Sequence, residues 1–119
     1  MMINRFLSLP RWLLLSMFYG CATAVLVLSL LPQASQPVLG SDKVNHIVAF
    51  GVLWVLGSRC WPRRPLLLAV FLTLFGVGIE IAQSFTPDRT ADVEDVLADV
   101  AGLLLAYLTT SLGRRLSRA

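Results

Sequence analysis

Residues 65–85 read PLLLAVFLTLFGVGIEIAQSF and contain one charged side chain, that of Glu80. A helix rises about 1.5 Å per residue, and about 20 apolar residues cross the hydrocarbon core of a bilayer. The run is therefore long enough and apolar enough for one membrane-spanning helix. Pro65 suits the first helical position, because a backbone N–H is not needed there. The stretch predicts a transmembrane helix that begins directly after a tight turn.

Three further apolar runs of similar length complete the chain. They cover residues 12–31, 44–61 and 93–112. A helix satisfies its own backbone hydrogen bonds, so it is the natural spanning element in lipid. We therefore expect an all-α fold, an integral membrane four-helix bundle, that forms one domain over residues 1–119.

The composition agrees with this fold class. Of the 119 residues, 56% are hydrophobic and 14% are charged, and the mean hydropathy is +0.74. A soluble domain of this size has too much surface to bury so many apolar side chains. The net charge of +3 does not indicate nucleic-acid binding, because the chain has neither a basic helix with interleaved aromatic residues nor a zinc-finger or RNA-binding motif.

The N-terminal apolar run admits two interpretations. Arg5 and Arg11 precede it, as in a signal peptide, and Cys21 faintly resembles the site at which a lipoprotein is cleaved. However, the run continues past Cys21 to Leu31, and no small polar cleavage region follows. We therefore expect a helix that is retained in the protein.

The distribution of charge predicts an orientation. With four spans, both termini and the turn between the second and third helices lie on one side of the membrane. That side carries eight of the ten basic residues, and the other side carries only Lys43 and Arg89. Basic residues concentrate on the cytoplasmic side, so we expect both termini in the cytoplasm. The acidic residues lie on the outer side or in the nearby helix ends: Asp42, Glu80, Asp88, Asp92, Glu94, Asp95 and Asp99.

Three of the predicted helices each carry a row of polar residues on one face, given about 100° per residue. The rows are Asp42, Asn45 and His46 in the second helix, Gly76, Glu80 and Gln83 in the third, and Asp92, Asp95 and Asp99 in the fourth. Glu94 points the opposite way. All three rows lie within about two to three turns of the outer surface. We therefore expect His46, Glu80, Asp95 and Asp99 to meet at one place.

Two explanations of this cluster remain open. An ionisable residue at the bilayer centre costs at least about 2.5–3.5 kcal/mol and usually serves a function. The alternative is a hydrogen-bond network that only holds the helices together, with small residues allowing close approach. We favour function, because several acids, a histidine and a glutamine converge. The spacing typical of close approach occurs at Gly20 and Ala24 in the first helix and at Ala98, Gly102 and Ala106 in the fourth.

Three separated motifs resemble those of one known family. The first is Asp42-Lys43-Val44-Asn45-His46, the second Glu80-Ile81-Ala82-Gln83, and the third Arg89 followed by Asp92, Asp95 and Gly102. In this order and spacing they resemble the VanZ-like family of small bacterial membrane proteins, from Ser29 onward. The family pattern runs D-K-x-x-H, E-x-x-Q and R-x-x-D-x-x-D-x-x-x-N-x-x-G. This chain departs from it at Asp99, where an Asn is usual, and at Ala106, where a second Gly is common.

The resemblance implies a multi-pass protein of the bacterial cytoplasmic membrane, and so of the cell envelope. The namesake of this glycopeptide-resistance family is associated with low-level resistance to teicoplanin. We do not extend resistance to this chain. The extra carboxyl group of Asp99 also changes the balance of charge that the family pattern would give.

Our leading hypothesis is a polar pocket at the outer leaflet that binds or processes the head group of a lipid or of an envelope precursor. Carboxylates and an imidazole suit a divalent cation, and cationic side chains suit a lipid phosphate. The candidate catalytic residues are His46, Glu80 and Asp95. The candidate metal ligands are Asp95, Asp99, Glu80 and His46, and the candidate ligand-binding residues are Asp42, Lys43, Gln83, Arg89 and Asp92.

Two other classes of function remain as alternatives. One is a non-catalytic envelope protein whose polar cluster only holds the bundle together. The other is a path for protons or ions, which is disfavoured because the inner halves of the helices lack ionisable groups. The sequence leaves open whether the chain is an enzyme and whether it forms oligomers.

Overall fold

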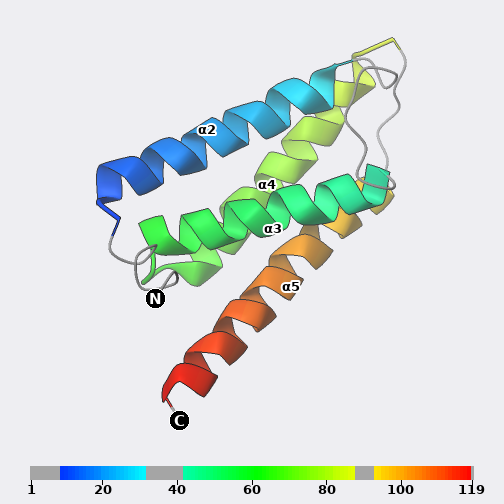
Figure 1. Ribbon diagram of the computed structural model, residues 1–119. Helices are drawn as coiled ribbons and strands as arrows, with labels where there is room; N and C mark the ends of the chain where they lie inside the picture. The colour runs from blue at the N-terminus through cyan, green and yellow to red at the C-terminus, as the bar shows by residue number, and fades with distance from the viewer. Residues whose placement is uncertain (1–8, 32–41, 88–92, 119) are drawn as a thin grey trace.

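The computed structural model describes residues 9–31, 42–87 and 93–118, which form four helices. The helices are α2 (Arg11–Leu30), α3 (Asp42–Cys60), α4 (Pro65–Ser84) and α5 (Val93–Arg118) (Figure 1). The all-α prediction is confirmed, and the expected helix bounds agree within two residues at every end but one. The exception is α5, which continues beyond residue 112 to Arg118. No proline interrupts residues 113–118, and arginine and leucine are good helix formers.

Backbone hydrogen bonds close the turn between α3 and α4. The N–H of Trp61 donates to the carbonyl of Gly57 over 2.8 Å, and the N–H of Arg64 donates to the carbonyl of Trp61 over 3.3 Å. Pro65 occupies the first turn of α4, as predicted, where its fixed φ favours helix and its missing N–H costs nothing. The turn is so short that α3 and α4 must run in opposite directions.

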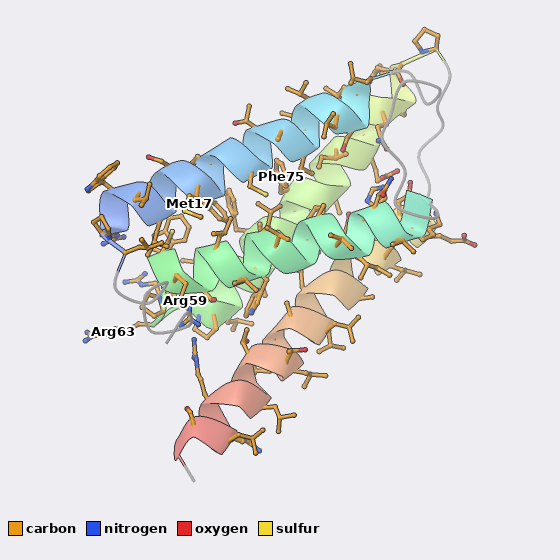
Figure 2. The ribbon with its side chains drawn as sticks, viewed as in Figure 1. Met17, Arg59, Arg63 and Phe75 are labelled. Carbon is orange, nitrogen blue, oxygen red and sulfur yellow. The ribbon has the colours of Figure 1, made fainter. Side chains whose placement is uncertain are left out.

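Successive helices run in opposite directions throughout the bundle (Figure 1). The starts of α3 and α5 therefore lie near the ends of α2 and α4. This end, which we call the acidic end, carries Glu80, Glu94, Asp95 and Asp99. The opposite end, which we call the basic end, carries Arg59 and Arg63 (Figure 2) together with Arg11, Arg64, Arg114 and Arg115. The described charges are thus separated along the helices, as the sequence predicts.

Helix α3 makes the most extensive contacts of the four described helices, mainly with α5 and α2. Its Phe50 and Leu53 are fully buried, as are Phe18 of α2 and both Leu72 and Ile79 of α4. The outward faces of the helices are also apolar. Large exposed side chains there include Leu66, Leu74, Ile81, Phe85, Leu97, Leu104, Leu108 and Leu116. An exposed surface this apolar suits a lipid surrounding rather than water.

Three of the described helices, α2, α4 and α5, are long and apolar enough to cross a membrane. Helix α3 is not among them, in contrast to the expectation that all four apolar runs span the membrane. Lys43, Asn45, His46 and Arg59 make it less hydrophobic. Because α3 exposes fewer of its side chains than the other described helices, it can carry more polar residues than a helix that faces lipid on most sides.

Close packing of α3 against α5 depends on Gly102. A Cβ atom at this position would overlap the backbone carbonyl of Ile47, so only glycine lets the two helices approach this closely. The small-residue prediction is therefore confirmed for Gly102. It is wrong for Gly20, because nothing lies within 4 Å of a Cβ built there. Gly20 and Ala24 are both exposed on α2. Among the described residues, no other helix packs closely against Gly20.

Candidate functional site

Three helices place polar side chains inside the acidic end. Five of these residues are buried: His46 (8% exposed), Glu80 (4%), Gln83 (1%), Asp95 (5%) and Asp99 (1%). Helix α3 supplies the histidine, α4 the glutamate and glutamine, and α5 the two aspartates. We call His46, Glu80, Asp95 and Asp99 the polar cluster. The structure thus brings together the four residues that helical periodicity expected to meet.

The face of α5 that enters the cluster agrees with the predicted one. Asp95 and Asp99 are one helical turn apart and both buried. Glu94, next to Asp95 in the sequence, has a side chain that is 76% exposed. Neighbouring positions on a helix differ by about 100° in direction, which explains the opposite environments of the two adjacent acids.

The imidazole of His46 lies between two carboxylates. Its Nδ1 is 2.6 Å from Oδ1 of Asp99, and its Nε2 is 3.7 Å from Oδ2 of Asp95. With the proton on Nδ1, the ring donates to Asp99 and directs the lone pair of Nε2 toward the Asp95 side. A carboxylate that fixes a histidine in this way is the usual arrangement behind a metal-bound or catalytic imidazole.

Asp99 fits beside α4 because position 76 is a glycine. A Cβ atom on Gly76 would lie 2.5 Å from Oδ2 of Asp99 and 3.3 Å from the ring of Phe50. Any larger residue at position 76 would push the carboxylate away from its place beside His46. Gly76 was expected on the same face as Glu80, but no residue pattern predicted that Gly76 makes room for Asp99.

Glu80 completes a group of potential metal ligands. One donor atom from each of His46, Glu80 and Asp95 lies within 4.8 Å of the other two. Two carboxylates and one imidazole form a ligand set that divalent cations accept. Lys43 is also present, and its Nζ forms an ion pair with Oδ1 of Asp95. The ammonium group therefore offsets part of the negative charge of the cluster.

Gln83 links the site to α2. Its Nε2 donates to the backbone carbonyl of Ser29 over 2.8 Å. The sequence singled out Gln83 for its type and spacing, but not Ser29, which takes part through its backbone oxygen. Nearly every residue has the same backbone carbonyl, so the residue type of Ser29 could not predict this contact. It is seen only in the packing of α2 against α4.

Three of the predicted ligand-binding residues cannot be placed at the site. Arg89 and Asp92 lie outside the described residues. Asp42 begins α3, but its side chain is also outside them. Lys43 and Gln83 are the predicted ligand-binding residues whose side chains are described.

A comparison with protein families identifies the relatives of this chain. A model of the VanZ/LLP1 family matches residues 2–114, which is nearly the whole sequence. The chain belongs to the VanZ/LLP1 family. The resemblance drawn from the three motifs is thereby confirmed. Comparisons with curated proteins and with solved structures gave no significant match.

The VanZ/LLP1 match includes the whole polar cluster, since His46, Glu80, Asp95 and Asp99 all fall within residues 2–114. In the VanZ-like pattern position 99 is usually an asparagine. An asparagine oxygen can also accept from Nδ1 of His46, but it carries no charge. Asp99 therefore offers an acceptor oxygen, as an asparagine would, and adds one ionisable group.

Proposed function

We propose that this VanZ/LLP1 protein binds the phosphate-bearing head group of a lipid or envelope precursor at the outer leaflet, with a divalent cation held by the polar cluster. The observation that carries the proposal is the approach of His46, Glu80 and Asp95 within 4.8 Å of one another. Three buried acids, with Asp99 as the third, need compensation in a medium of low dielectric constant. Lys43 supplies one positive charge through its ion pair with Asp95, and a divalent cation would add two more.

The proposal places the protein in the cytoplasmic membrane with four spans and both termini inside. Helix α3 would be the fourth span, packed mainly against α5 and α2. Its 19 residues correspond to about 28 Å of helix, close to the thickness of the hydrocarbon core. The polar cluster would then lie near the outer surface, within reach of a head group.

The arrangement also supports a chemical role for His46. Nδ1 of His46 lies 2.6 Å from Oδ1 of Asp99, and the proposal assigns to Nε2 the binding of the cation or the acceptance of a proton from water. Glu80 and Asp95 are the other predicted catalytic residues, and both are buried carboxylates. Lys43 and Arg89 would bind the phosphate oxygens, for which lysine and arginine are the common partners. Hydrolysis of the bound head group would be a separate step that binding does not require. A turnover assay measures it.

Thermal unfolding of the detergent-solubilised protein tests the cation. A cation that binds only the folded state raises the melting temperature with increasing concentration. We expect magnesium, calcium, manganese or zinc to do so relative to a chelator, and Asp95→Asn to lose most of the rise. Glu94→Gln is the matched control, because it removes a neighbouring but exposed charge and should keep the response.

One structural alternative is also supported by specific contacts. Gln83 joins α4 to α2, and Lys43 joins α3 to α5 through Asp95, so the polar residues also hold helices together. If no divalent cation changes the melting temperature from acidic to mildly alkaline pH, and Glu80→Gln and Asp95→Asn both lower it, the structural function replaces the binding function.

Retained lipid gives a separate test of the head group. Mass spectrometry of lipids that remain bound to the purified protein should find a phosphate-bearing species with the wild type. The same species should be depleted in Glu80→Gln and His46→Ala, but retained in Glu94→Gln. Equal lipid content in all four proteins would contradict a head-group site at the cluster.

A further inference from the structure

A pocket of about 240 Å³ lies at the basic end, between α2, the turn at 61–64 and α4. Its lining consists of Tyr19, Trp61, Arg64, Leu67, Leu68 and Phe71, so Arg64 is the one charged residue among the residues that form it. Positions 67, 68 and 71 follow position 64 at intervals of three, four and seven residues and therefore share one face of the helix. The pocket thus joins one stripe of α4 to aromatic rings from α2 and the turn.

Contacts between aromatic rings fix one wall of this pocket. The rings of Tyr19 and Trp61 meet edge to face at 6.3 Å, and the ring of Phe18 meets them at 5.3 and 5.1 Å respectively. Phe18 is 1% exposed and belongs to the core. The backbone N–H of Trp61 also donates to the carbonyl of Gly57 over 2.8 Å. The wall is therefore formed in advance, which lowers the cost of ordering it when a ligand binds.

Arg64 brings a positive charge to the same pocket. Its N–H donates to the carbonyl of Trp61 over 3.3 Å, and its carbonyl accepts from the N–H of Leu68 over 3.0 Å, so its backbone is held between two other lining residues. Its side chain is exposed. The acidic residues whose side chains the structure describes all lie at the acidic end, because none occurs before Asp42, between Lys43 and Ile79, or after Asp99. The described chain therefore offers Arg64 no carboxylate at the basic end.

The size and the walls of the pocket indicate what can occupy it. One turn of a helix, about 10 Å across and 5.4 Å long, fills roughly 400 Å³, so a further helix is too large. An inorganic anion would leave the apolar walls without a partner. A hydrocarbon chain is narrow enough, and it can enter past Leu67 and Phe71, which are 59% and 53% exposed on α4. Tryptophan and tyrosine are typical of the membrane interface, where a lipid chain joins its head group.

We propose that this pocket, which we call the aromatic pocket, binds one acyl chain of an anionic phospholipid, whose phosphate is held by Arg64. The forked donors of a guanidinium group match phosphate oxygens. Arg11 and Arg63 at the same end add positive charge, which favours a head group of net negative charge over a zwitterionic one. The aromatic pocket lies at the opposite end of the helices from the polar cluster, so it does not depend on the function proposed for that cluster.

Brominated lipids test the proposal, because bromine atoms on an acyl chain quench the fluorescence of a tryptophan that they contact. The full-length protein with Trp12→Phe, which removes a reporter that is 69% exposed, is placed in nanodiscs of phosphatidylcholine with a minor fraction of phosphatidylglycerol. Only one of the two lipids is brominated in each sample. The readout is the quenching divided by the mole fraction of the brominated lipid. The further variant Trp61→Phe measures the part that comes from Trp54.

We expect phosphatidylglycerol to quench Trp61 about fivefold more than phosphatidylcholine at equal mole fraction, the preference that one basic residue gives for an anionic lipid. Arg64→Gln should bring the ratio close to one. Arg63→Gln is the matched control, because it removes the same charge from an exposed neighbour that points away from the helices (Figure 2). It should keep most of the preference.

The proposal fails if the two lipids quench Trp61 equally, or if the preference persists after Trp61→Phe. It also fails if Arg63→Gln lowers the ratio as much as Arg64→Gln does, because the lipid would then be attracted by the total charge of the basic end and not by a site. The melting temperature of Arg64→Gln in discs of phosphatidylcholine alone should equal that of its parent, since the side chain is exposed. A lower melting temperature would assign Arg64 to the fold and would also overturn the proposal.

Discussion

Asp99 fixes the position of His46, and its own place depends on Gly76. The short contact between Nδ1 of His46 and Oδ1 of Asp99 is buried on all sides. Breaking a buried hydrogen bond lowers stability by more than its formation adds, because the remaining partner stays buried without a hydrogen bond. The geometry of the polar cluster therefore depends on the carboxylate of Asp99, which contacts His46 and occupies the space left by Gly76.

We predict that Asp99→Ala destabilises the protein by about 1–3 kcal/mol, because His46 loses its buried acceptor. Asp99→Asn should cost less, since the amide oxygen still accepts from Nδ1 and the VanZ-like pattern usually has asparagine here. Unfolding by denaturing detergent, measured for both variants in the same membrane mimic, gives the comparison. Equal losses for Ala and Asn would show that the hydrogen bond to His46 is not what Asp99 contributes.

The pairing of α3 with α5 sets the geometry of the site at the level of the elements. These two helices carry Lys43, His46, Asp95 and Asp99, and they approach each other at Gly102. Any separation of the helices would lengthen both contacts of His46 at once. The position of a single glycine, one turn beyond Asp99, thus limits how far the acids lie from the histidine.

We predict that Gly102→Ala lowers stability by about 1–3 kcal/mol, the usual cost of overpacking, because the backbone carbonyl of Ile47 cannot rotate away. It should also weaken any stabilisation by divalent cations. Gly78→Ala is the control, since a Cβ on Gly78 of α4 meets nothing within 4 Å. Thermal unfolding with and without cation measures both effects. A Gly102→Ala protein as stable as the control would contradict the close approach of α3 and α5.

At the scale of the whole molecule, charge is divided between the two ends of an apolar bundle. The described arginines lie at the basic end and the described acids at the acidic end, and exposed leucines and valines lie between them. In a membrane, we expect this division to orient the molecule with its basic end in the cytoplasm. The polar cluster would then face the outer leaflet.

We predict that reporters fused after Ala119 or inserted in the turn at 61–64 are cytoplasmic, and that one inserted near Gln36 is outside. The turn is the decisive position, because it lies inside only if α3 crosses the membrane. A reporter in the turn that is found outside would reduce the protein to three spans, in keeping with the lower hydrophobicity of α3. A C-terminal reporter found outside would reverse the proposed orientation of α5.

The residue order alone was enough to predict where the helices lie and which of their faces carry polar residues. Both follow from local patterns, namely the length of apolar runs and the repeat of about 3.6 residues per turn. This is why Glu94 and Asp95 could be assigned to opposite faces before any contact was known. The same local information also placed Pro65 at the start of α4.

The packing of the helices against one another determines which rows of polar residues meet and which of their atoms face each other. It selected Gly102 rather than Gly20 as the point of close approach, gave Asp99 the space left by Gly76, and joined Gln83 to the carbonyl of Ser29. It also showed that α3, the described helix that is not apolar enough to count as a candidate span, exposes the fewest side chains. These features depend on how the helices are rotated and shifted against one another, and such offsets are set by packing between distant segments rather than by any local repeat.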